Sequence, residues 1–253
     1  MTPQQKDFAG RSALVTGAAS GIGAAAAKAL AARGAARLFL VDIDGAGLDG
    51  LDLPGEVHRI VGSVADEALW QALDPRLAGL DHALVNAGIG SGGPIASISL
   101  AEWRRVMAVN LDGAFMTLAS SLRAMEQRGG SVVVVASVTG IKPVPGIGPY
   151  GVSKAAVAHM ARIAAAESAR KGIRVNAIAP GGVDTAIWES GADFTASVEA
   201  IGREATIKAM AKTTPLGRFA TSEEMADSIL YLLSDAAANI TGHVMVSDGG
   251  FTL

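Results

Sequence analysis

Short apolar runs alternate with stretches of helical spacing along almost the whole chain. The runs have the length of buried strands, whereas the stretches between them repeat apolar residues every three or four positions. The predicted strands are 12–16, 37–41, 56–61, 81–85, 131–136, 173–179 and 243–247. The predicted helices are 22–33, 66–73, 100–127, 149–171 and 222–234. This alternation predicts an α/β fold in which a doubly wound parallel sheet of about seven strands has helices on both faces.

One segment, residues 182–217, interrupts this alternation. It follows a predicted strand and places apolar residues at roughly helical intervals: Ile187, Trp188, Phe194, Ile201, Ile207 and Met210. Such a segment can simply pack against the core. Its length and its position at the carboxyl end of a strand favour a small lobe that covers a substrate. No linker or repeat divides the chain, so we expect a single domain over residues 1–253.

Composition excludes several classes of function. The chain has 253 residues, a net charge of −3 and no cysteine. The charge gives no electrostatic reason to bind nucleic acid or an anionic membrane, and no stretch is long and apolar enough to span a bilayer. The four histidines are scattered, so we expect no metal site. The N-terminus lacks the pattern of a signal peptide, and we expect a soluble cytoplasmic protein.

A glycine-rich turn lies between the first predicted strand and the first predicted helix. It reads TGAASGIG over residues 16–23. Glycines there let the backbone approach a pyrophosphate closely, and the helix N-terminus supplies free N–H groups. Asp42 ends the next strand, at the usual offset for a carboxylate that binds a ribose 2′-hydroxyl. Since Asp42 would repel a 2′-phosphate and Ile43 supplies no cation, the charges favour NAD over NADP.

A second group of polar residues surrounds residues 137–154. Tyr150 and Lys154 are four positions apart at the start of a predicted helix, so they lie on one helix face. An ammonium near a phenol favours the phenolate and lowers the tyrosine pKa, which makes a general base. Ser137 follows a predicted strand, and its hydroxyl can hold the oxygen on which the tyrosine acts. A tyrosine–lysine pair at this spacing also occurs by chance on solvated helices.

Together these motifs resemble the short-chain dehydrogenase/reductase family over essentially the whole chain. Residues 16–23 resemble its TGxxxGxG turn, residues 86–88 its NNAG signature, and Ser137, Tyr150 and Lys154 its serine and YxxxK pair. The resemblance implies a Rossmann fold and an NAD cofactor. It also implies that Asn110 is a fourth catalytic residue, whose backbone carbonyl, in a distorted turn of the long helix, holds a water molecule that links Lys154 to solvent. An asparagine that merely bends its helix is the alternative.

The resemblance also implies sets of binding residues. The expected cofactor contacts are Gly17, Ser20, Gly21, Ile22, Gly23, Asp42, Ser63, Val64, Asn86, Ala87, Gly88, Tyr150, Lys154, Pro180, Gly181, Val183 and Thr185. The expected substrate contacts are Ser137, Thr139, Val144, Tyr150, Gly181 and Trp188. Two positions depart from the family pattern. Val85 replaces the first asparagine of NNAG, and Ser63 replaces the aspartate of an adenine-contacting Asp-Val pair.

The expected pocket wall is mostly apolar, which favours a largely apolar or cyclic secondary alcohol or ketone as the small-molecule substrate. A 3-oxoacyl or β-hydroxyacyl thioester is the main alternative, because many family members act on those. A catalytically silent NAD sensor is a third possibility, although such relatives commonly lose the tyrosine or lysine. The family is usually tetrameric, and we expect a homotetramer built through the long helices.

Overall fold

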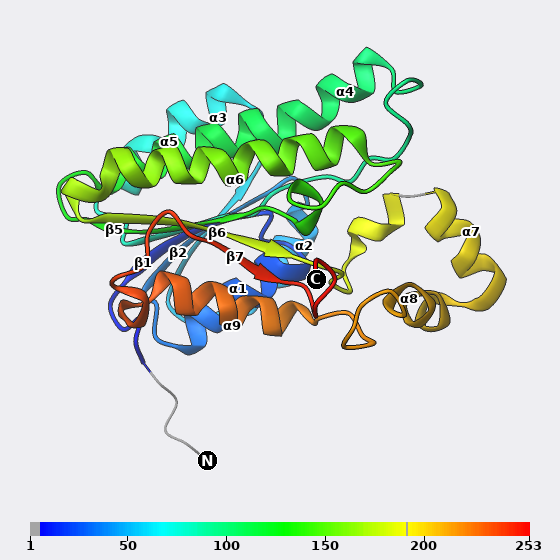
Figure 1. The fold of residues 1–253 in the computed structure, drawn as a ribbon. Coiled ribbons are helices and arrows are strands. Elements are labelled where there is room, and N and C mark those ends of the chain that lie inside the picture. The colour runs from blue at the N-terminus through cyan, green and yellow to red at the C-terminus, as the bar shows by residue number, and fades with distance from the viewer. Residues whose placement is uncertain (1–5, 191) are drawn as a thin grey trace.

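The computed structural model describes residues 6–190 and 192–253. Its centre is a seven-stranded sheet in the order β3-β2-β1-β4-β5-β6-β7, with every neighbouring pair parallel (Figure 1). The strands are β1 (Ser12–Thr16), β2 (Arg37–Asp42), β3 (Glu56–Val61), β4 (His82–Val85), β5 (Gly130–Val135), β6 (Ile173–Pro180) and β7 (Val244–Ser247). The predicted doubly wound parallel sheet is confirmed, and its boundaries differ from the predicted ones by about one residue.

Helices cover both faces of this sheet. They are α1 (Gly21–Ala32), α2 (Gly45–Asp49), α3 (Glu67–Leu73), α4 (Leu100–Met107), α5 (Ala114–Met125), α6 (Gly148–Ser168), α7 (Ala192–Ile201), α8 (Arg203–Ala211) and α9 (Ser222–Leu233). Helices α3 to α6 lie on one face and α1 and α9 on the other, while α7 and α8 project beyond the sheet (Figure 1). None of the described helices is both long enough and apolar enough to cross a membrane.

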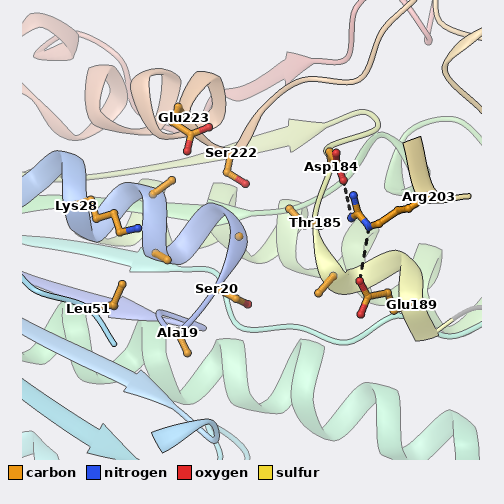
Figure 2. A pocket seen from close by; sticks show the side chains of 14 residues that line it. Ala19, Ser20, Lys28, Leu51, Asp184, Thr185, Glu189, Arg203, Ser222 and Glu223 are labelled. Atoms are coloured by element: carbon orange, nitrogen blue, oxygen red, sulfur yellow. Dashed lines mark ion pairs between the residues drawn. The ribbon is translucent and has the colours of Figure 1, made fainter. Parts of the chain in front are cut away.

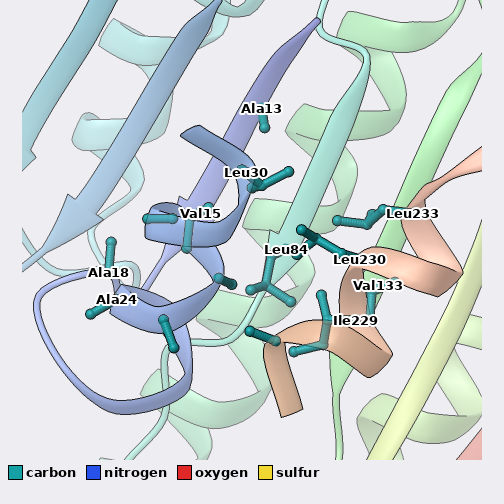
Figure 3. Packing of buried hydrophobic residues seen from close by; sticks show 14 of the residues in the cluster. Ala13, Val15, Ala18, Ala24, Leu30, Leu84, Val133, Ile229, Leu230 and Leu233 are labelled. Atoms are coloured by element: carbon teal, nitrogen blue, oxygen red, sulfur yellow. The ribbon is translucent and has the colours of Figure 1, made fainter. Parts of the chain in front are cut away.

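Each face of the sheet has its own apolar core. On one face, α1 and α9 pack on the central strands through small and branched residues such as Ala24, Leu30 and Ile229, all of them buried (Figure 3). On the other face, Leu118 of α5 and Val157 of α6 contact a second cluster. Because alanine dominates α1, the helix can approach the strands closely. That close approach places the start of α1 directly above the end of β1.

Local signals in the sequence set several helix ends. Thr221 accepts a hydrogen bond from the Glu224 amide, and the Glu224 carboxylate accepts one from the Thr221 amide, which completes a capping box at α9. Thr221 is therefore the N-cap of α9. Gly34 follows α1 with a φ of 96° and lets the chain turn toward β2.

The predicted helical stretch 100–127 is not one continuous α-helix, and the distorted turn that the resemblance implies at Asn110 is confirmed. It consists of α4 and α5 joined by a π-helical turn, η2 (Ala108–Gly113). A π turn accommodates one extra residue and keeps the apolar stripe of both helices facing the sheet, so the hydrophobic pattern does not reveal it. The short helix α2 was also missed, because five residues are too few for a recognisable period.

Candidate active site

The carboxyl ends of β1, β4, β5 and β6 converge at one edge of the sheet. The chain first passes outward through β2 and β3 and then continues on the other side of β1 through β4. The connections therefore leave β1 and β4 in opposite directions. Open α/β sheets bind their ligands at such a switch point. Every strand that the sequence analysis linked to a polar motif ends at this edge or beside it.

The glycine turn forms a tight bend between β1 and α1. Gly17 and Gly21 have φ values of 64° and 51°, which side chains rarely adopt. A Cβ on Gly23 would lie 1.9 Å from the Gly17 carbonyl oxygen, so only glycine fits there. Asn86 Nδ2 donates to the carbonyl oxygens of Thr16 at 2.9 Å and Gly17 at 3.1 Å. These hydrogen bonds fix the backbone of the turn beside the N-terminus of α1.

The Thr16 hydroxyl is a contribution that the sequence analysis did not assign. It accepts hydrogen bonds from the backbone amides of Asn86 at 3.0 Å and Ala87 at 3.2 Å. Since Thr16 is fully buried, these bonds fix the end of β4 against the glycine turn. Its position as the first residue of the glycine motif was the one sequence feature that pointed to a role for Thr16. Asn86 acts in the same way, through backbone carbonyls of the turn.

Asp42 occupies the end of β2 and faces the glycine turn. Its Oδ2 accepts a hydrogen bond from the Ala19 amide at 2.9 Å, and its Oδ1 accepts one from the Asp44 amide at 3.0 Å. The carboxylate is thereby fixed beside the turn that the sequence predicted as a pyrophosphate cradle. Each carboxylate oxygen has a second lone pair that can accept a hydroxyl. This geometry fits a ribose diol next to a phosphate.

Tyr150 and Ser137 face each other near the ends of α6 and β5. The Tyr150 phenol hydrogen-bonds with the Ser137 side chain. Ser137 Oγ also accepts a hydrogen bond from the Thr139 hydroxyl at 3.0 Å and another from its amide at 3.2 Å. Because Pro149 precedes Tyr150 in the first turn of α6, the tyrosine has a fixed entry into the helix. The phenol and the serine hydroxyl can therefore contact one substrate oxygen together.

Lys154 is fully buried one helical turn after Tyr150. Its Nζ donates to the Val135 carbonyl at 2.8 Å and lies 5.7 Å from the centre of the Tyr150 ring. Burial lowers the pKa of Lys154 to about 8. Burial also raises the pKa of Tyr150, and the hydrogen bond from Ser137 offsets only part of that effect. In this structure the ammonium donates to the Val135 carbonyl, and the expected lowering of the tyrosine pKa by Lys154 stays a prediction.

Asn110 lies in the π-helical turn and is almost completely buried. Its Oδ1 accepts from the Ile89 amide at 2.8 Å, and its Nδ2 donates to the Ile89 carbonyl at 3.0 Å and to Ser153 Oγ at 3.2 Å. These bonds connect the loop after β4 with α6. Ser153, next to Lys154, was not assigned from the sequence. A Cβ on Gly88 would meet both Asn110 Oδ1 and Lys154 Nζ within 3.4 Å. The glycine therefore lets the loop after β4 pack closely against the π-helical turn and α6.

Residues after β6 complete the site. A Cβ on Gly181 would lie 2.8 Å from Asp248 Cα, and one on Gly21 would lie 3.1 Å from Thr185 Cγ2. Thr185 thus packs directly against the glycine turn. Val183 is buried and pairs with Ala220 in an isolated bridge, which joins the two ends of the 182–217 lobe. These contacts bring the predicted residues Gly181, Val183 and Thr185 to the same edge of the sheet as the predicted catalytic residues.

Trp188 and Ser63 make contacts within the protein that were not assigned from the sequence. The Trp188 indole stacks on Phe219 with ring centroids 5.5 Å apart and donates to the Val183 carbonyl at 2.7 Å. It therefore anchors the base of the lobe, and its predicted substrate contact stays a prediction. Ser63 Oγ accepts from the Ala65 amide after β3, while Val64 is buried against Gly113. The half-buried Val144 lies on the loop before α6.

A cavity of about 540 Å³ opens beside the N-terminus of α1 (Figure 2). Its walls come from the glycine turn, from the side of α1, from the start of α9 and from the lobe. Ser20, Gly21 and Thr185 all line it, which places three of the predicted cofactor contacts around one space. Since no Cβ fits at Gly23 and Asp42 faces the adjoining turn, the residues present fit a dinucleotide.

Comparisons with known proteins agree with this geometry. The sequence model of a family described as enoyl-(acyl carrier protein) reductase matches residues 17–252. The chain is 40% identical over 254 residues to a cis-4-hydroxycyclohexanecarboxylate dehydrogenase of Sinomonas cyclohexanicum, covering 97% of this chain and 98% of the relative. It is 36% identical over 255 residues to a 2,5-dichloro-2,5-cyclohexadiene-1,4-diol dehydrogenase of Sphingobium indicum, again covering 97% and 98%.

Solved structures give the same result. The crystal structure of levodione reductase superposes with a TM-score of 0.86 at 34% identity, covering 96% of this chain and 98% of that one. The agreement extends over the sheet, both helical layers and the lobe, because nearly the full length of each chain is aligned. Together with the motifs at the carboxyl edge of the sheet, these matches show that the chain belongs to the short-chain dehydrogenase/reductase family.

Proposed function

We propose that this protein is an NAD-dependent dehydrogenase that interconverts a cyclic, largely apolar secondary alcohol and its ketone. The observation that carries the proposal is the group formed by the buried Ser137 and Lys154 and the half-buried Tyr150 beside the glycine turn. Relatives named for a hydroxycyclohexanecarboxylate and a cyclohexadienediol support a ring-shaped substrate. NAD supplies the hydride acceptor when it is bound.

Each residue has a defined task in this proposal. Ser137 and Tyr150 hold the substrate oxygen, and Tyr150 takes the hydroxyl proton during oxidation or returns it during reduction. The Lys154 ammonium stabilises the phenolate that forms and receives the ribose of the cofactor. Asn110 fixes the loop after β4 against α6, so that Lys154 stays in place. The 182–217 lobe covers the substrate and excludes water.

Asp42 supports NAD in preference to NADP. Its carboxylate is fixed beside the glycine turn by the Ala19 and Asp44 amides, and Ile43 follows it with 72% of its surface exposed. A 2′-phosphate at this place would meet a fixed negative charge and an apolar side chain. We expect Asp42→Ala to lower the ratio of NAD to NADP activity by about tenfold or more, the equivalent of about 1.4 kcal/mol.

The proposal includes the assembly and the compartment. A homotetramer is supported by apolar residues on the outer surface of the long helices, where Phe115 of α5 and Val152 and Ile163 of α6 are about half exposed. Light scattering at micromolar concentration tests it, and a monomer would contradict it. We further propose that the protein acts in the cytoplasm as one folded domain.

The decisive experiment follows absorbance of reduced nicotinamide with NAD and with NADP. The panel contains cyclohexanol, cis-4-hydroxycyclohexanecarboxylate, linear alcohols, linear hydroxyacids, sugars and β-hydroxyacyl thioesters. We expect cyclic alcohols with NAD to give the highest kcat/KM, and Tyr150→Phe to reduce it about 10³-fold through loss of the proton-transferring hydroxyl. Tyr231→Phe is the matched control, because Tyr231 is 41% exposed on α9, away from the catalytic group.

A 3-oxoacyl or β-hydroxyacyl thioester reductase-dehydrogenase is the second candidate. A relative from Thermotoga maritima that is named as a 3-oxoacyl-[acyl-carrier-protein] reductase, 36% identical over 254 residues, favours it. It predicts that β-hydroxyacyl thioesters exceed every cyclic alcohol in the same panel. Binding of NADH without turnover of any compound would instead support a silent NAD sensor. The presence of serine, tyrosine and lysine in one group argues against that outcome.

A further inference from the structure

Arg203 is a charged residue of the lobe that lines the cavity and pairs with two carboxylates that also line it. It opens α8 and forms ion pairs with Asp184 at 2.6 Å and Glu189 at 3.8 Å. These two carboxylates flank Thr185, the threonine that packs against the glycine turn. All three charged side chains line the 540 Å³ cavity, and Arg203 lies on the wall opposite α1 (Figure 2).

The position of Arg203 is unfavourable for helix stability. It is the first residue of α8, where the helix dipole disfavours a cation. Gly202, with a φ of 82°, turns the chain directly before it. The ion pairs are also 42–61% exposed, so they add little to the stability of the fold. Helix stability therefore does not account for an arginine at this position, and we look for its effect in the cavity.

The charges of the cavity indicate what that effect is. Its lining contains three acids, Asp184, Glu189 and Glu223, and two bases, Lys28 and Arg203, which gives a net charge of −1. Without Arg203 the net charge of the lining would be −2, with two carboxylates beside Thr185. A pyrophosphate at the start of α1 carries two negative charges, and neighbouring like charges would weaken its binding.

We propose that Arg203 is a cofactor-positioning residue that neutralises Asp184 and Glu189, so that the segment around Thr185 can approach the pyrophosphate of the dinucleotide. The proposal rests on the proposed function, since it requires a dinucleotide in this cavity. It assigns to Arg203 an electrostatic effect exerted through two carboxylates, without a contact between its guanidinium and the phosphates. Removing the carboxylates must therefore abolish the need for the arginine.

The test compares ligands that differ in phosphate charge. Equilibrium binding of NADH, ADP-ribose and adenosine is measured by fluorescence or calorimetry for the wild type, for Arg203→Met and for the triple variant Asp184→Asn/Glu189→Gln/Arg203→Met. We expect Arg203→Met to weaken NADH and ADP-ribose by about three- to tenfold, a range suited to exposed charges. The loss should shrink at high salt, adenosine binding should stay unchanged, and the triple variant should return to within about twofold of the wild type.

Two results would overturn the inference. Equal weakening of adenosine would mean that Arg203 merely supports the lobe. A triple variant as weak as Arg203→Met would mean that the guanidinium itself contacts the phosphates. Arg218→Met is the matched control, because Arg218 pairs with Glu224 and lies outside this cavity. If the wild type binds neither NADH nor ADP-ribose, the proposed function fails; if it binds both and Arg203→Met equals the wild type, only this inference fails.

Discussion

The two ends of the sheet both bury polar side chains, but they satisfy them differently. At the amino ends of the strands, Ser131 Oγ donates to the Leu233 carbonyl and hydrogen-bonds with His82 Nδ1. Arg174 donates to four carbonyl oxygens around the end of α9, those of Leu232, Leu233, Ser234 and Ile240. At the carboxyl ends, the buried Lys154 ammonium faces a neutral carbonyl. The amino end satisfies its polar groups with several hydrogen bonds, whereas the carboxyl end buries a charge at a cost in stability, a charge that the proposed reaction would use.

The largest expected effect comes from Lys154→Met at the carboxyl end. We expect kcat to fall about 10³-fold, because the phenolate loses its cation. We also expect the free energy of unfolding at pH 7 to rise by about 1 kcal/mol, since the variant no longer buries an ammonium. The lysine pKa is lowered to about 8, so the burial penalty is fully present below pH 8 and disappears as the pH rises toward the unfolded value.

Kinetics and urea unfolding of the same preparations check this prediction. Lys171→Met is the matched control, because Lys171 is half exposed and forms a surface pair with Glu126. It should change neither kcat nor stability by a measurable amount. A Lys154→Met protein that is inactive and also less stable would contradict this prediction, because it would show that the buried lysine stabilises the fold.

The next effect is expected from Arg174→Ala at the amino end. Four carbonyl oxygens would lose their donor, and the C-terminus of α9 would lose a cation that its dipole favours. We expect the free energy of unfolding to fall by about 3 kcal/mol, with kcat per folded molecule unchanged. Denaturant unfolding measures the loss, and Arg170→Ala, at an exposed position nearby, is the control. A drop in kcat per folded molecule would contradict this prediction, because it would show that the amino end of the sheet also affects the reaction.

The smallest effect concerns His82 in acid. Burial lowers the pKa of His82 to about 4, and the Asp81 carboxylate offsets only part of this. The unfolded chain therefore binds more protons than the folded one between about pH 6.5 and pH 4, so stability falls as the pH falls through this window. We expect His82 to account for about 2 kcal/mol of the loss between pH 7 and pH 5.

His82→Gln keeps a donor for Ser131 and removes the titration. The variant should lose correspondingly less stability between pH 7 and pH 5, as urea unfolding across that range would show. His159→Gln, at an exposed position on α6, should follow the wild type. If the free energy of unfolding of His82→Gln depended on pH as that of the wild type does, His82 would not be the group responsible for the loss of stability in acid.

The sequence predicted the sheet well because strand patterns are local. Each apolar run between turns carries its own signal, and the strand that ends in Asp42 was placed to within one residue. The glycine turn was equally readable, since steric exclusion at Gly23 admits one residue type. A turn that requires a glycine at a fixed position can be recognised from the sequence, because no other residue type fits there.

Properties that depend on packing could not be predicted in the same way. The π-helical turn around Asn110 leaves the apolar spacing of its two flanking helices intact. The direction of the Tyr150 pKa depends on how deeply the phenol is buried and on which acceptor Lys154 contacts. Trp188 could be recognised as a large apolar residue of the lobe, but its stacking partner Phe219 lies 31 positions later in the chain.

The paired ends of the lobe have a consequence for how this scaffold can change. The Ala220 amide donates to the Gly182 carbonyl at 2.9 Å, and the Asp184 amide donates to the Ala220 carbonyl at 3.2 Å. The lobe thus leaves the end of β6 and returns to the same point before the chain enters α9. Lengthening such an excursion is inexpensive, since doubling a loop adds only about 0.6 kcal/mol of closure entropy. Lobes of different length and composition can therefore be exchanged at residues 182 and 220 as replaceable cassettes, while the strands and the tyrosine–lysine pair stay as they are.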